Sequence, residues 1–99
     1  MADEKTFLIG ATIKISVVVK DDGAYYTPTP SSGDAVTVTI YNDDAAVVTD
    51  QALSADDTGR YSWGYDSSSA APGLCKAIVT ITDGTDVTMR KGFFKLERE

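Results

Sequence analysis

A chain of 99 residues with 42% apolar residues is long enough for one core and too apolar to stay disordered. Its net charge of −6 argues against nucleic acid as a partner, because its nine Lys and Arg residues are scattered and form no basic stripe. There is no histidine and one cysteine, Cys75, which excludes an internal disulfide, the common zinc sites and every nucleophile that depends on histidine. We therefore expect a non-enzymatic, disulfide-free domain without a cofactor.

The chain begins with Met-Ala-Asp-Glu-Lys, which lacks the basic start and apolar run of a signal peptide. The longest aliphatic run covers only residues 17–19, so we expect no membrane contact. If Met1 is the native start, we expect cytoplasmic synthesis, with the product free in the cytosol or built into a particle assembled there. If Met1 was added to an excised domain, that expectation does not hold.

Alternation of apolar and polar residues dominates the chain and predicts strands rather than helices. The alternating runs are rich in Val, Ile, Thr and Tyr, which suit a half-buried pleated surface. Asn42-Asp43-Asp44 and Asp83-Gly84 predict tight reversals, and Gly92 predicts a bulge or a close backbone contact in the last strand. The expected strands are 7–9, 12–20, 35–41, 45–50, 58–65, 74–82 and 86–96, with a further short one near 52–54 left open.

About seven short strands in one hundred residues are typical of an antiparallel sandwich with Greek-key connections. We expect a single domain over 1–99, with polar tails at 1–6 and 97–99. Two connections, 21–34 and 66–73, are long for so small a domain, and long loops are often functional. For 21–34 we favour a structural interpretation, a short hairpin at 24–27 followed by a proline-stiffened crossover between sheets.

Two stretches of the second half of the chain follow a known pattern. Asp57-Thr58-Gly59-Arg60-Tyr61 has an Asp-x-Gly-x-Tyr spacing, and residues 72–80 read Pro-Gly-Leu-Cys-Lys-Ala-Ile-Val-Thr before Asp83-Gly84. This resembles bacterial and phage immunoglobulin-like domains, although Cys75 stands where those domains usually have Tyr. The resemblance implies an immunoglobulin-like β-sandwich and a role as a spacer, adhesin or virion surface module. It implies no catalytic residues.

Three aromatic residues, Tyr61, Trp63 and Tyr65, share one face of a predicted strand. We expect these rings to fill the core, because a sandwich without a disulfide needs large buried side chains. The alternative is an exposed platform on which sugar rings stack, which would make the chain a carbohydrate-binding or cell-surface adhesion module cut from a larger protein.

Acidic residues gather in pairs at predicted turns, among them Asp21-Asp22 and Asp56-Asp57. Asp is favoured in turns because its side chain accepts hydrogen bonds from the local backbone, and this is the reading we prefer. A calcium site formed by Asp21, Asp22, Asp56 and Asp57 is the weaker alternative, since hard cations bind such oxygens.

A binding surface is predicted from apolar residues that fall out of phase with the inward positions of their own strands. Val18, Ile78 and one of the pair Phe93–Phe94, for which we take Phe93, would form an outward patch together with Tyr25 and Tyr26. Tyr41 is a further candidate for an exposed contact surface. The alternative places the apolar residues at sheet edges beneath the long loops. The expected function is a structural module of a phage virion, in the capsid decoration, neck or tail, which contacts other protein subunits or further copies of itself.

Overall fold

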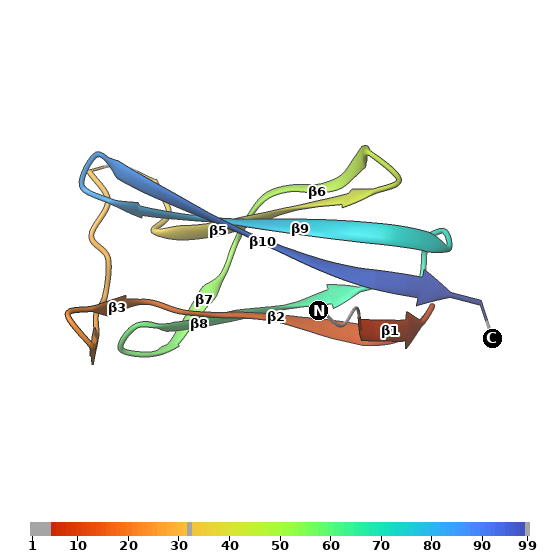
Figure 1. Cartoon of the computed structure of the whole chain (residues 1–99), viewed down its shortest axis with the longest axis horizontal. Coiled ribbons are helices and arrows are strands. Elements are labelled where there is room, and N and C mark those ends of the chain that lie inside the picture. Colours follow the sequence, from red (N-terminus) through yellow and green to blue (C-terminus); the bar gives the residue numbers. More distant parts are fainter. Residues whose placement is uncertain (1–4, 32, 99) are drawn as a thin grey trace.

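The computed structural model describes residues 5–31 and 33–98, and throughout these residues the chain forms only strands, turns and irregular connections. Figure 1 shows two layers, with β5, β6 and β9 in one and β2, β7 and β8 in the other. A five-stranded sheet has the order β1-β10-β9-β5-β6, a three-stranded sheet has the order β2-β8-β7, and β3 and β4 form a separate hairpin. The strands are β1 (Lys5–Leu8), β2 (Thr12–Val18), β3 (Lys20–Asp21), β4 (Ala24–Tyr25), β5 (Val36–Asn42), β6 (Ala45–Ala52), β7 (Ser54–Asp57), β8 (Arg60–Asp66), β9 (Gly73–Asp83) and β10 (Asp86–Glu97).

The first and last strands are neighbours in the five-stranded sheet. β1 pairs in parallel with the end of β10, from Lys5 opposite Phe94 to Leu8 opposite Glu97. Every other strand pair of the described residues is antiparallel. Both sheets are open, and none of the described residues forms a helix that could cross a membrane.

The core lies between the two sheets and follows the alternation in the sequence. In β5, Val36, Val38 and Ile40 are at most 1% exposed, and the residues between them are half-buried on the outward side. Both sheets contribute to the same cluster. Its buried members are Ile13, Val36, Val38, Ile40, Leu53, Tyr61, Tyr65, Cys75, Ala77, Val79, Phe94 and Leu96.

The all-β class and the absence of a disulfide are confirmed. Cys75 is fully buried and unpaired, and burial raises the pKa of its thiol. The aromatic residues of β8 belong to the core, as expected: Tyr61 and Tyr65 are 6% and 8% exposed, and Trp63 packs partly buried against them. These rings are therefore not an exposed platform.

The expected number of about seven strands is wrong, because the described residues form ten. The additional strands are β3, β4 and β7. A turn at Asp22-Gly23, with φ of 55° and 83°, divides off the two-residue strands β3 and β4. At Leu53, which is 7% exposed, the chain leaves β6 of one sheet and enters β7 of the other. A buried residue at the crossing separates two strands that the sequence pattern does not clearly divide.

The turns are placed as expected, while the interpretation of Gly92 is wrong. Asp43 and Asp44 adopt positive φ between β5 and β6, and Gly84 adopts positive φ between β9 and β10. Gly92, by contrast, pairs with Ala77 in an unbroken register, and a Cβ at this position would have no heavy atom within 4 Å. It therefore marks open space rather than a bulge or a close contact.

Candidate functional site

The outward face of the five-stranded sheet carries apolar and basic side chains. Along β9, every second residue from Cys75 to Val79 is buried, so Leu74, Lys76 and Ile78 point away from the core. No other layer of the described part of the chain packs against this outward face. This surface is therefore available to a partner.

The strand register arranges these residues in rows across three strands. Phe93 of β10 lies opposite Lys76 of β9, and Lys76 lies opposite Tyr41 of β5. In the adjacent row, Lys91 lies opposite Ile78. A lysine thus stands beside each ring. We name this surface the aromatic–lysine face, and its members are Tyr41, Leu74, Lys76, Ile78, Lys91 and Phe93.

Both lysines lie over aromatic rings of the face. The Nζ atom of Lys76 is 5.0 Å from the centre of the Tyr41 ring, and that of Lys91 is 5.6 Å from the centre of the Phe93 ring. Both distances are within the range of a cation–π interaction. Phe93 and Leu74 remain 46% and 44% exposed, and they line a shallow hollow of about 290 Å³. The lysines therefore hold the rings in place without covering them.

The outward face of the three-stranded sheet has a different character. Its register pairs place mostly small polar or charged residues on the surface, and Val18, 52% exposed, is the one large apolar side chain among them. A strand face of this kind is an ordinary solvated surface. The outward residues of β2 and β8 are Thr12, Lys14, Ser16, Val18, Arg60, Ser62, Gly64 and Asp66.

The structure divides the five predicted binding residues between two places. Ile78 and Phe93 lie on adjacent strands of the aromatic–lysine face, whereas Val18 lies on the other sheet, opposite Arg60. Tyr25 and Tyr26 lie with Val18 at the β3–β4 hairpin, where Arg60 binds Tyr25 and the Tyr26 N–H donates to the Val19 carbonyl. Of the pair of phenylalanines, Phe93 is outward, as we expected, and Phe94 is 5% exposed in the core.

Sequence reasoning left three residues out of this surface, Leu74, Lys76 and Lys91. The signal was present, because all three share the phase of Ile78 or Phe93 on the same strands. Leu74 is apolar and out of phase with Cys75, so the rule that selects Ile78 selects it as well. Lys76 and Lys91 fall outside this rule, because a charged residue in the outward phase of a strand is ordinary by itself.

Tyr25 is exposed at the hairpin but held by two cations. The Nη2 atom of Arg60 donates a hydrogen bond of 2.8 Å to the Tyr25 hydroxyl, and the guanidinium carbon lies 4.6 Å from the ring centre. The Lys20 Nζ atom is 5.1 Å from the same ring centre. These contacts attach the β3–β4 hairpin to β8, which belongs to the three-stranded sheet and not to the sheet that carries the aromatic–lysine face.

Tyr26 ties the long connection to the β9–β10 turn. Its hydroxyl donates a hydrogen bond of 2.8 Å to Asp83, whose other carboxylate oxygen accepts one from the backbone N–H of Thr29 at 3.0 Å. These donors lower the pKa of Asp83, and the bond to Asp83 raises the pKa of Tyr26. Gly84 adds a backbone bond of 2.7 Å to Thr29. The connection thus combines a short hairpin with an anchored crossover, but the hairpin spans 20–25 and not the expected 24–27.

The acidic pairs make local hydrogen bonds. Asp57 accepts one of 2.8 Å from the backbone N–H of Thr58, and Asp56 accepts one from the hydroxyl of Ser62. Asp21 and Asp22 lie at the tip of the β3–β4 hairpin. Within residues 5–31 and 33–98, no three or more carboxylate or thiol groups come together in a way that could hold a metal ion.

Comparisons with protein-family models, with curated proteins and with solved structures found no match to this chain. The geometry of its surfaces therefore carries the functional argument.

Proposed function

We propose that this chain is an immunoglobulin-like β-sandwich domain that acts as a non-enzymatic structural or binding module and docks on another protein through the aromatic–lysine face. Three features support the fold assignment. Two sheets enclose one core, the first strand pairs in parallel with the last, and the β2-β8-β7 sheet lies opposite. The Asp57–Tyr61 and 72–80 motifs supply the resemblance to bacterial and phage domains of this type.

The aromatic–lysine face is the observation that carries the functional proposal. Aromatic residues are enriched at protein interfaces, and an exposed apolar patch without a folding role marks an interaction site. The outward face of the other sheet is polar apart from Val18, so the two sheets differ in the surface they present. Lys76 and Lys91 carry positive charge on the patch, and Asp43 and Asp44 border the same hollow, so a partner surface with groups of both signs would match it.

We propose a phage virion as the setting, with the domain in the capsid decoration, neck or tail. This rests on the resemblance to phage domains and on a simple consideration of binding: a repeated protein lattice lets many small faces bind at once. The alternative, a carbohydrate-binding or adhesion module, has less support. The aromatic residues on which it depended, Tyr61 and Tyr65, are buried.

The experiment that tests this function is co-sedimentation of the chain with particles assembled from the structural proteins encoded beside its gene. Ile78→Asp and Phe93→Asp should each reduce the bound amount at least about tenfold, a change of about 1.4 kcal/mol in binding free energy. Val18→Asp, on the polar face, is the matched control and should bind like the parent. Each variant should keep its melting temperature within about 5 °C, because these are outward positions.

Two results would contradict the proposal. Normal binding by both aromatic–lysine variants would place the interface elsewhere. A collapse of the melting temperature in Ile78→Asp would mean that this side chain has a folding role, and Phe93→Asp, at a more exposed position, would then decide whether the face binds.

A further inference from the structure

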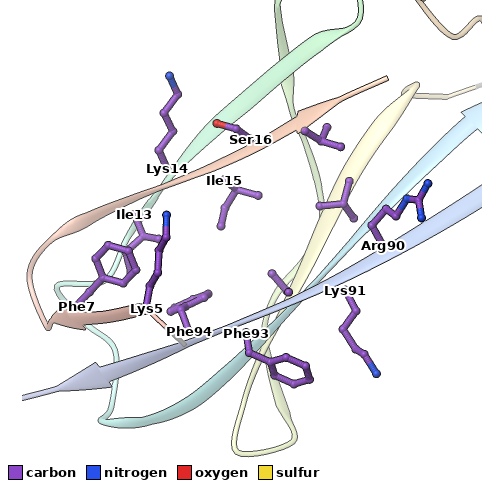
Figure 2. A pocket seen from close by; sticks show the side chains of 14 residues that line it. Lys5, Phe7, Ile13, Lys14, Ile15, Ser16, Arg90, Lys91, Phe93 and Phe94 are labelled. Carbon is purple, nitrogen blue, oxygen red and sulfur yellow. The ribbon is translucent and has the colours of Figure 1, made fainter. Parts of the chain in front are cut away.

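A groove separates the edge of β2 in one sheet from the edge of β10 in the other. Its volume is about 310 Å³, and β1 closes one end. Figure 2 shows Ile13 and Ile15 pointing into it from β2, with Phe94 on the opposite side. We call this the inter-sheet groove. It is distinct from the aromatic–lysine face, although Lys91 and Phe93 border both.

The inter-sheet groove exists because small residues meet at one position of the inner face. Along β10 and β9, the inward pairs run from Phe94 opposite Cys75 to Gly92 opposite Ala77. The side chains of Phe94 and Cys75 fill the space between the sheets, whereas Gly92 and Ala77 leave it empty. A Cβ at Gly92 would have no heavy atom within 4 Å. Apolar side chains remain partly exposed as a result, among them Ile15 and Val17.

Basic residues border this apolar floor. Lys5, Lys14, Arg90 and Lys91 line the groove, and none of the carboxylates among the described residues does. Figure 2 shows the side chains of Lys14 and Lys91 directed away from the floor, so Lys5 and Arg90 supply the charge beside it. None of these four cations is within ion-pair distance of a carboxylate in the described part of the chain, where Lys95 and Glu97 form the salt bridge. In an acidic chain, so uneven a distribution gives the groove a local positive potential that attracts an acidic ligand.

The groove also meets unpaired strand edges. β1 covers only the last four residues of the outer edge of β10, and within residues 5–31 and 33–98 no strand pairs with 86–93 on that side. Consecutive residues of both strands line the groove, residues 13–17 and 90–94, so it borders the backbone edges and not only inward side chains. Such an edge presents free N–H and C=O groups that can pair with an added strand.

We propose that the inter-sheet groove binds an extended, acidic segment of another protein, which adds as a strand along residues 86–93 of β10. Main-chain hydrogen bonds to the edge supply affinity, alternate apolar side chains enter the space at Gly92, and carboxylates meet Lys5 and Arg90. The occupant is taken to be a peptide because the groove pairs a backbone edge with an apolar floor and a basic border. A compact small molecule would use only the floor.

The test uses the full chain and a labelled synthetic peptide that alternates valine with aspartate over about eight residues, within the usual length of a strand. Fluorescence anisotropy should detect saturable binding. A peptide with lysine in place of aspartate is the control and should bind at least about tenfold more weakly, since its charges repel the cations of the groove.

Two variants place the binding in the groove. Gly92→Leu puts a side chain into the empty space, where its Cβ meets no heavy atom within 4 Å, and should weaken peptide binding at least about tenfold, whereas Met89→Leu, on the opposite face of β10 and 66% exposed, should have no effect. Arg90→Glu should weaken binding by a similar factor, and Arg98→Glu, beyond the end of β10, is its control. Circular dichroism melts verify that the variants fold.

Strand addition has its own signature, because it slows hydrogen exchange at the backbone. On peptide binding, amides of residues 86–93 should exchange more slowly. The proposal is overturned if the acidic peptide fails to bind, if the lysine peptide binds equally well, or if binding survives Gly92→Leu. It is also overturned if the peptide binds while exchange in residues 86–93 is unchanged, which would identify a ligand of the floor and not an added strand.

Discussion

Gly59 gives a physical meaning to the Asp-x-Gly-x-Tyr spacing. It sits in the turn between β7 and β8 with φ of 70°, a conformation that L side chains rarely adopt. A Cβ there would come within 2.5 Å of the Val19 carbonyl oxygen and 2.8 Å of the Tyr26 nitrogen. The glycine therefore allows the chain at residues 19–26 to pass over the turn. The backbone N–H of Val19 in turn donates to the Gly59 carbonyl at 2.7 Å.

Gly59→Ala should destabilise the domain by at least about 2 kcal/mol, from the left-handed backbone and from the displacement of adjacent backbone. Gly84→Ala is the matched control, because Gly84 has a similar φ of 63° but open space around its Cα. It should lose only the backbone contribution, about 1 kcal/mol. Urea unfolding of both variants measures the difference. Equal losses would mean that the close contact at Gly59 contributes nothing.

At the scale of the element, β10 contributes large apolar side chains to both the core and the surface. Its inward phase ends in Phe94 and Leu96, which are 5% and 1% exposed, and its outward phase carries Phe93 to the aromatic–lysine face. A strand that is apolar in both phases at one point has one side chain in the core and one on the surface.

Phe94→Ala and Phe93→Ala should therefore differ sharply. Loss of the buried ring costs about 3–5 kcal/mol, a large part of the stability of a domain this small. Loss of the exposed ring removes one cation–π contact with Lys91 and should change the free energy of unfolding by no more than about 1 kcal/mol. Chemical denaturation of both variants measures the two losses of unfolding free energy. A large loss in Phe93→Ala would mean that this ring supports folding rather than a partner.

Elements with strong alternation could be predicted from sequence alone, and those set by tertiary pairing could not. β5 and β9 were found within one or two residues, because their inward positions are uniformly apolar. β7 is Ser-Ala-Asp-Asp, fully exposed, and is a strand only because β8 lies beside it. Likewise, alternation placed Ile78 and Phe93 outward, but sheet membership separated them from Val18. The inter-sheet groove depends on which strand lacks a neighbour, and one sequence does not reveal that.

At the scale of the whole molecule, some strands are hydrogen-bonded on both sides and others on one side only. We expect local stability against opening to follow this difference. β9 lies between β10 and β5 and is paired on both sides. β10 is paired on both sides only where β1 runs beside it. The sheet is thus firmest along β9 and weakest at its borders, where β6 and the first part of β10 lie.

Hydrogen exchange of the protein without a partner should reproduce this pattern. Amides of β9 should exchange slowest, near the rate set by global unfolding, because both edges of that strand are hydrogen-bonded. In residues 86–93 of β10, the N–H groups that point away from β9 should exchange much faster, since alternate groups of a border strand lack a partner. Residues 94–97, which β1 covers, are the control on the same strand and should be protected. If 86–93 were as protected as 94–97, the border of the inter-sheet groove would already be covered, and a strand from another protein could not add there.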